Sequence, residues 1–260
     1  MPGMIDKQLV RERFERSLRS YAKHAVVQNR MASDLSEMVF RQCGRGPFGR
    51  VFEVGSGTGA LTLELLKRCR AESYFANDIV EESRIFLEDV FERFPVGEFG
   101  FVAGDIESGG AIPECLDLVV SNATMQWLGD LEGFFRRIRS HVRPGGVLAF
   151  STFGPMNMQE IASIEQTGLP YLSIGEITEL AGKYFDIAEC REEQVKLEFT
   201  TPEAVLRHIR LTGVNGVSRK TWTKGRYRQF LDCYLERFPS GEGVSLTYHP
   251  IYCCLKKENS

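Results

Sequence analysis

The feature that most constrains the fold of this chain is a glycine-rich segment between an apolar run and a helical pattern. Residues 51–61 read Val-Phe-Glu-Val-Gly-Ser-Gly-Thr-Gly-Ala-Leu. Glycines let the backbone turn tightly and approach a ligand, and the N-terminus of a following helix favours a negative group. The segment therefore predicts a strand, a ligand-binding turn and a helix.

Short apolar runs and helical patterns alternate from residue 51 to residue 153. Alternating strands and helices specify a mostly parallel sheet with helices on both faces, so we expect an α/β fold with Rossmann-like architecture. The expected strands are 51–54, 74–77, 99–103, 116–121 and 147–153, and the expected helices are 60–69, 81–94 and 130–141.

A length of 260 residues suits a single domain. The pattern before the glycine segment is helical, and after residue 153 the alternation loosens. We expect a late pair of helices to lie over an edge of the sheet as a lid. The expected parts of the domain are an N-terminal helical cap at 1–45, a core at 50–200, a helical lid at 202–240 and a final strand at 244–256.

Composition argues against several classes of protein. The net charge of −3 does not favour nucleic-acid binding, and no apolar run approaches the ~18 residues of a membrane-spanning helix. The charged N-terminus has no signal-peptide pattern, so we expect a cytoplasmic protein. The seven scattered cysteines predict free thiols, and the four histidines have no spacing that suggests a metal site.

The glycine segment alone leaves two ligand classes open. Gly55, Gly57 and Ala60 also fit the pattern of dinucleotide-binding proteins. Glu53, however, lies two residues before the first glycine, and a carboxylate there would repel a pyrophosphate. The same carboxylate suits the ammonium group of a methionine moiety. Glu53 therefore favours S-adenosyl-L-methionine as the ligand.

Polar residues also follow the later strands, at the edge of the sheet where open α/β proteins bind ligands. Asp78 can accept the two ribose hydroxyls, and Asp105 can accept the exocyclic amine of adenine. From residue 50 to residue 153 the ordered motifs resemble those of class I methyltransferases. The cofactor-binding residues expected on this stretch are Glu53, Gly55, Ser56, Gly57, Asp78, Ile79, Asp105, Ile106 and Asn122.

The clearest indication of the acceptor lies in residues 121–127, which read Ser-Asn-Ala-Thr-Met-Gln-Trp. The amide of Gln126 and the indole N–H of Trp127 can both donate hydrogen bonds without carrying charge. Two such donors after the fourth strand would hold a carboxylate beside the methyl donor. A packing role for this tryptophan, with an incidental glutamine, is the alternative interpretation.

Two further motifs lie near the ends of the chain: residues 20–28 read Ser-Tyr-Ala-Lys-His-Ala-Val-Val-Gln, and residues 246–249 read Leu-Thr-Tyr-His. With the core motifs, they make the chain similar over nearly its whole length to the malonyl-acyl-carrier-protein O-methyltransferases of biotin synthesis. It departs from that family at residues 108–114, where the family usually has Leu-Pro, and at Val214, where the family usually has alanine.

The resemblance implies methylation of the free carboxylate of a malonyl thioester, carried by an acyl carrier protein or by coenzyme A. N-terminal helices commonly cover the cofactor in this fold. We therefore assign Tyr21, with Gln126 and Trp127, to the catalytic end, and Gln28 to the methionine end of the cofactor. No metal is implied.

A basic segment lies late in the chain, since residues 204–231 contain seven Lys or Arg and no Asp or Glu. Arg207 and Arg210 would share one face of a helix, where either can pair with the malonyl carboxylate. An ordinary solvated face is the alternative interpretation. The other five cations are candidates for contact with an acidic carrier protein: Arg219, Lys220, Lys224, Arg226 and Arg228.

Two other functions remain open from the sequence alone. One is a carboxyl methyltransferase for a small free acid, of the trans-aconitate type. The other is a non-catalytic module that binds S-adenosyl-L-methionine and supports a partner. Comparing malonyl carrier protein, malonyl-coenzyme A and trans-aconitate as methyl acceptors would distinguish these functions.

Overall fold

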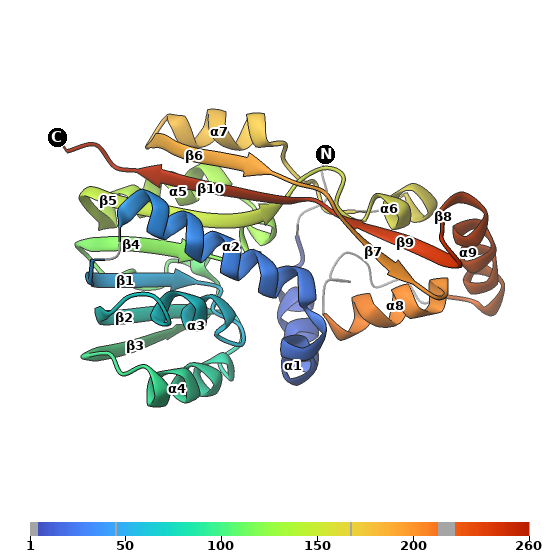
Figure 1. Ribbon diagram of the computed structural model, residues 1–260, viewed down its shortest axis with the longest axis horizontal. Helices are drawn as coiled ribbons and strands as arrows, with labels where there is room; N and C mark the ends of the chain where they lie inside the picture. Colours follow the sequence, from blue (N-terminus) through green and yellow to red (C-terminus); the bar gives the residue numbers. More distant parts are fainter. Residues whose placement is uncertain (1–4, 45, 167, 213–221, 260) are drawn as a thin grey trace.

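A seven-stranded sheet is the central layer of the computed structural model, which describes residues 5–44, 46–166, 168–212 and 222–259 (Figure 1). Its strand order is β3-β2-β1-β4-β5-β10-β6; β1 to β5 run parallel, and β10 pairs antiparallel with both β5 and β6. The strands are β1 (Phe48–Val54), β2 (Ala71–Asp78), β3 (Glu98–Ala103), β4 (Leu116–Ser121), β5 (Val142–Phe153), β6 (Asp186–Glu192) and β10 (Pro250–Lys256).

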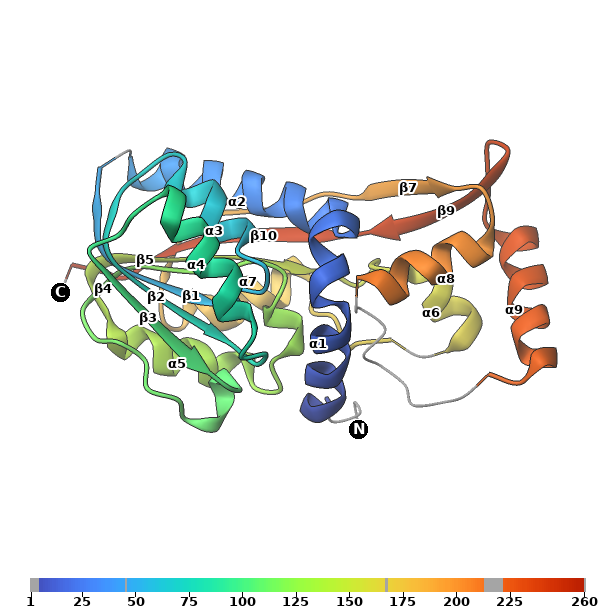
Figure 2. The same cartoon turned by 90° about the horizontal axis from the view of Figure 1, so that it is seen from below.

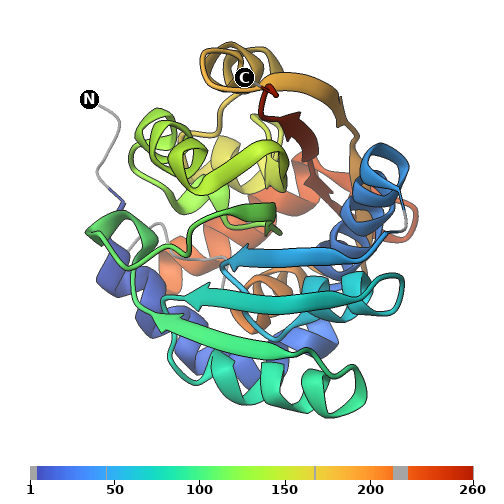
Figure 3. The same ribbon diagram turned by 90° about the vertical axis from the view of Figure 1, so that its left-hand side faces the viewer.

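Helices cover both faces of this sheet, and each face has its own apolar cluster (Figures 1 and 3). Neighbouring strand residues enter different clusters because side chains alternate between faces. Cys253 and Cys254 on β10 follow this rule. One face carries α2 (Val26–Cys43), α3 (Ala60–Leu66) and α4 (Ser83–Arg93), and the other carries α5 (Leu131–His141) and α7 (Ile174–Gly182). The predicted α/β fold class is confirmed.

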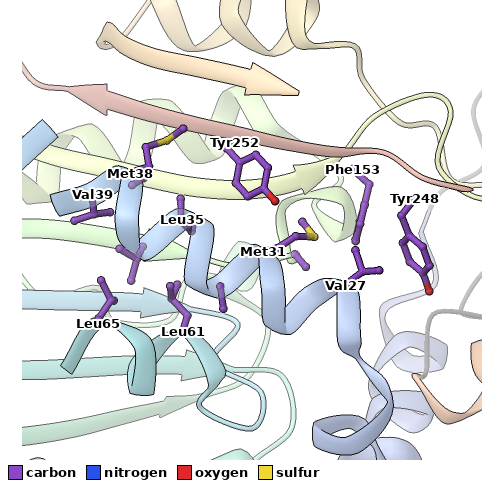
Figure 4. Packing of buried hydrophobic residues seen from close by; sticks show 14 of the residues in the cluster. Val27, Met31, Leu35, Met38, Val39, Leu61, Leu65, Phe153, Tyr248 and Tyr252 are labelled. Atoms are coloured by element: carbon purple, nitrogen blue, oxygen red, sulfur yellow. The ribbon is translucent and has the colours of Figure 1, made fainter. Parts of the chain in front are cut away.

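The larger cluster packs α2 against α3 and the sheet. Met31, Leu35 and Met38 recur on one side of α2 and are fully buried (Figure 4). They pack in one cluster with Leu61 and Leu65 of α3. This contact fixes α3 directly behind the glycine segment.

The final strand expected at 244–256 is divided into two strands in different sheets. β9 (Gly243–Tyr248) pairs with β7 (Val195–Phe199) and β8 (Pro239–Ser240), whereas β10 continues in the main sheet. The division falls at His249, whose carbonyl accepts from Gly154 N at 2.8 Å and whose Nδ1 accepts from Met156 N at 3.2 Å. A period-two pattern does not reveal this change of partner.

The expected lid helices are α8 (Pro202–Leu211) and α9 (Lys224–Arg237). They pack with α6 (Gln159–Glu165) against the three-stranded sheet, beyond the end of the main sheet (Figure 2). Their expected position over the edge of the main sheet is therefore wrong. The core expected at 50–200 also includes β7, which belongs to the three-stranded sheet.

The first helix, α1 (Lys7–His24), crosses the region beyond the carboxyl ends of β1 and β2 (Figures 1 and 2). Asp6 caps it by accepting a hydrogen bond from Leu9 N at 2.9 Å. Near its other end, Ser20 Oγ donates to the carbonyl oxygen of Leu211 at 3.1 Å, which joins α1 to α8. None of the helices in the described ranges is long and apolar enough to cross a lipid bilayer.

We predict that Glu160 on α6 anchors the three-stranded sheet. Its buried carboxylate accepts from Thr247 N at 3.0 Å and from Thr247 Oγ1 at 2.6 Å. Replacing Glu160 with Leu leaves both buried donors unpaired, so the free energy of unfolding should fall by about 1–3 kcal/mol. Chemical denaturation measures the change, and Glu160→Gln, which can still pair with Thr247, should lose less. Equal midpoints for Glu160→Leu and the parent protein would contradict this role.

Candidate active site

A cavity lies between α1 and the carboxyl ends of β1, β2, β3 and β4. Its empty space of about 940 Å³ includes the part that is open to solvent. Among the residues expected from the sequence, the cavity brings together Tyr21, Glu53, Gly55, Ser56, Gly57, Asp78, Ile79, Asp105, Ile106, Asn122 and Trp127.

The end of β2 holds the glycine loop in place. The carbonyl oxygen of Asn77 accepts from Gly55 N at 2.8 Å and from Ser56 N at 3.0 Å. Asp78 accepts from Gly57 N at 2.7 Å. Gly55 has φ +72°, and a Cβ at this position would lie 2.1 Å from Thr124 Oγ1. Only glycine fits there, because a side chain would be both strained and obstructed.

Glu53 places a buried carboxylate at the floor of the cavity, with 1% of the residue exposed. Thr62 Oγ1 and Tyr74 OH both donate to Glu53 Oε2 at 2.5 Å. Within the described residues, Oε1 has no hydrogen-bond partner. Burial raises the pKa of Glu53 to about 7, although the two hydroxyl donors oppose this change. A cation placed beside Oε1 would favour the ionised form.

Asp105 and Glu107 follow β3, and a lysine from α1 pairs with both of them. Lys7 Nζ lies 2.5 Å from Glu107 Oε2 and 3.3 Å from Asp105 Oδ1. Glu107 also accepts from Gly129 N at 2.9 Å and from Asp130 N at 2.8 Å. Burial opposes ionisation, but these partners lower the pKa of Glu107 below its ordinary value.

Aromatic residues also line the cavity. Trp127 is buried, and its Nε1 has no hydrogen-bond partner among the described residues. Its ring meets Phe14 edge to face, with centroids 5.7 Å apart. Burial and the nearby Asp78 raise the pKa of Tyr21 far above its ordinary value, so its hydroxyl remains a donor at neutral pH. Trp127 and Tyr21 therefore present uncharged donors.

Four of the expected residues do not line the cavity. Gln126 Nε2 donates to the carbonyl oxygen of Ala123 at 2.6 Å, because adjacent residues on the 3₁₀ turn Met125–Trp127 point in different directions. Gln28 is 1% exposed and has no partner for its amide atoms among the described residues, although its carbonyl accepts from Asn122 Nδ2 at 3.0 Å. The other two, exposed on α8, are Arg207 and Arg210.

Several cavity residues were not expected from the sequence. Val10, Phe14 and Leu18 line the cavity from α1, and their helical spacing with Tyr21 was the available signal. Lys7 had no such signal, because nothing near it in the sequence identifies its two carboxylate partners. Thr124, which packs against Gly55, was also missed. In the described part of the chain, no group of three or more His, Cys, Asp or Glu could hold a metal ion.

Comparisons with known proteins agree with this geometry. The family model described as "Methyltransferase domain" matches residues 52–150. A putative methyltransferase from Bacillus halodurans C-125 superimposes with a TM-score of 0.64 at 14% identity, covering 87% of this chain and 99% of that one. Phosphoethanolamine N-methyltransferase 2 from Haemonchus contortus, solved with S-adenosyl-L-methionine, gives a TM-score of 0.54 at 14% identity, covering 86% and 52%. These two structures share the fold.

Fold, cavity and family model together define a class I methyltransferase that uses S-adenosyl-L-methionine. The more specific assignment comes from sequence relatives named malonyl-[acyl-carrier protein] O-methyltransferase. The relative from Chlorobium luteolum is 52% identical over 99% of this chain and 98% of its own, and that from Prosthecochloris aestuarii is 48% identical over 97% and 94%. The chain belongs to this family of O-methyltransferases, and the prediction of the family from sequence is confirmed.

We predict that Glu53 makes cofactor binding dependent on pH. A pKa of about 7 means that the carboxyl group is largely neutral in mildly acidic solution, whereas an ammonium group pairs with the ionised form. Affinity for S-adenosyl-L-methionine should therefore rise between about pH 5.5 and about pH 7.5, below the α-amino titration near 8. Calorimetry in buffers of different ionisation enthalpy should detect proton release.

Glu53→Gln is the matched control for this prediction. It keeps the size of the side chain and cannot ionise, so it should bind the cofactor more weakly and with little pH dependence. The same pH dependence in both proteins would show that another group is responsible.

Proposed function

We propose that this protein transfers the methyl group of S-adenosyl-L-methionine to the free carboxylate of a malonyl thioester carried by an acyl carrier protein. The observation that carries the proposal is that one cavity combines buried carboxylates with uncharged hydrogen-bond donors. The carboxylates of Glu53 and Asp78 line this cavity together with the indole N–H of Trp127 and the hydroxyl of Tyr21. The names of the close relatives support the same acceptor.

The reaction requires correct positioning of the acceptor carboxylate and does not require a side-chain base. A carboxylate with an ordinary pKa near 4 is already ionised at neutral pH. No histidine is among the described residues that line the cavity. The cofactor, when bound, supplies a methyl group on a positively charged sulfur. The remaining task of the protein is to hold the acceptor oxygen in line with that methyl, ~3–3.5 Å away.

Neutral donors suit such an acceptor because they orient the carboxylate without pairing permanently with its charge. The free indole N–H of Trp127 and the protonated hydroxyl of Tyr21 meet this requirement. A fixed arginine at the reacting oxygen would stabilise the ground-state charge that must disappear during transfer. The exposed positions of Arg207 and Arg210 agree with this distribution of charge.

The carrier would meet the cations outside the cavity. Arg207 and Arg210 on α8, and Lys224 and Arg228 on α9, are exposed. Arg226 is a weaker candidate, because it pairs with Glu165 Oε2 at 2.5 Å. The two other candidates from the sequence, Arg219 and Lys220, lie outside the described residues.

The direct test supplies labelled S-adenosyl-L-methionine with one acceptor at a time. Malonyl carrier protein should be methylated with a higher kcat/KM than malonyl-coenzyme A, and trans-aconitate should be inactive. Preference for trans-aconitate would instead support the small-acid methyltransferase. Cofactor binding without transfer to any of the three acceptors would support the binding module.

We predict that Trp127→Phe slows methyl transfer and leaves cofactor affinity nearly unchanged. The substitution keeps an aromatic ring against Phe14 and removes one donor to a charged acceptor. A lost hydrogen bond of this kind should lower kcat/KM about ten- to hundredfold. Steady-state kinetics and calorimetry measure the two effects separately. Full activity would assign Trp127 to packing alone.

A second prediction separates two roles for Arg207 and Arg210. If they guide the carrier, Arg207→Met/Arg210→Met should raise the KM for malonyl carrier protein, change kcat little and weaken the salt dependence of KM. A short malonyl thioester without a carrier should react as it does with the parent enzyme. If either arginine binds the malonyl carboxylate, both acceptors should lose activity. Arg84→Met, on the distant helix α4, is the control.

A further inference from the structure

α1 forms one wall of the cavity and is fastened at both ends. Val10, Phe14 and Tyr21 line the cavity from this helix. Ser20 ties its later part to α8 through the carbonyl oxygen of Leu211. Lys7, the first residue of the helix, ties the other end to the loop after β3 and lines the cavity itself.

The partner of Lys7 is rigidly placed. Glu107 lies in the 3₁₀ turn Ile106–Ser108 and accepts from Gly129 N and Asp130 N, just before α5 begins. Its carboxylate is therefore attached to the central domain by two backbone hydrogen bonds before Lys7 is counted. Lys7 pairs with this fixed group at 2.5 Å, and their side chains are 27% and 21% exposed.

Lys7 also reaches Asp105 Oδ1 at 3.3 Å, and Asp105 is the residue assigned to the adenine end of the cofactor. The lysine therefore joins α1 to the central domain where a bound adenine would lie. A ligand held between α1 and the strand ends can leave at that end only by passing the Lys7 ion pairs or after these pairs have broken.

We propose that Lys7 is a positioning residue that holds α1 closed over the adenine end of the bound cofactor and slows its release. The inference rests on the cofactor part of the proposed function and is independent of the acceptor. An anchor that only stabilises the helix would change the free energy of unfolding. A residue that closes α1 over the ligand, here called a clasp, also changes the rate at which the ligand dissociates.

The test measures dissociation of S-adenosylhomocysteine from immobilised protein by surface plasmon resonance. Lys7→Met should raise the dissociation rate constant about tenfold, the effect expected for losing one charge-assisted hydrogen bond, with a smaller change in the association rate. Lys7→Arg keeps the charge and should restore slow release. Arg11→Met removes an exposed cation one turn further along α1 and should release the ligand at the parent rate.

The salt dependence of ligand dissociation is a second measurement. An ion pair that only anchors the helix would leave this rate unchanged. Raising ionic strength from about 0.05 M to about 1 M shortens the Debye length from above 10 Å to about 3 Å. Dissociation from the parent protein should become faster, whereas dissociation from Lys7→Met should change little.

Three outcomes would overturn the proposal. Unchanged release from Lys7→Met would contradict the proposed role of Lys7 and leave the cofactor assignment intact. Equal acceleration in Arg11→Met would show a general effect of charge on α1. Failure of the parent protein to bind S-adenosylhomocysteine would overturn the cofactor assignment itself, and the clasp with it.

Discussion

Asp78 accepts hydrogen bonds from Gly57 N at 2.7 Å and from Val80 N at 2.8 Å, so one carboxylate joins the loop after β1 to the loop after β2. The carbonyl oxygen of Asn77 adds two further bonds to the glycine loop. α3 begins directly after that loop, and its Thr62 reaches back to Glu53. The direction of α3 and the position of the Glu53 carboxylate both depend on this connection between two strand ends.

These carboxylates also determine which ligand charge the site favours. Burial raises the pKa of Asp78, and Asp78 contributes to the raised pKa of Glu53. Two neighbouring buried carboxylates repel each other until a cation lies between them or one takes a proton. A pyrophosphate would increase that repulsion, and a ligand with ammonium and sulfonium charges would relieve it. The electrostatics of the site thus support the ligand class that Glu53 indicated from the sequence.

The fold class, and the meeting of the expected cofactor-binding carboxylates at one cavity, could be predicted because their determinants are local. Parallel strands bring their carboxyl ends to one edge, so Glu53, Asp78 and Asp105 had to approach one another. The division at His249 could not be predicted, because an alternating run does not record which strand it pairs with. Lys7 was missed for a related reason: its partners lie 98 and 100 residues away.

The residues expected to bind the acceptor show the same limit at shorter range. Gln126 and Trp127 are adjacent in the sequence and were expected to act together, but only the indole faces the cavity. The amide of Gln126 instead hydrogen-bonds Ala123, a residue with φ +51°, and thereby supports the turn that presents Trp127. The sequence identified two possible donors, and the backbone geometry determines which of them faces the cavity.

Contact between α1 and α8 links the wall of the cavity that carries Tyr21 to the second sheet. Ser20, whose hydroxyl bonds the end of α8, immediately precedes Tyr21, whose side chain lines the cavity. If the carrier docks on the exposed arginines of α8 as proposed, it touches a helix that packs directly on this wall. The second sheet holds α8 against α1. It can support carrier docking in this way without lining the cavity, which lies at the strand ends of the main sheet.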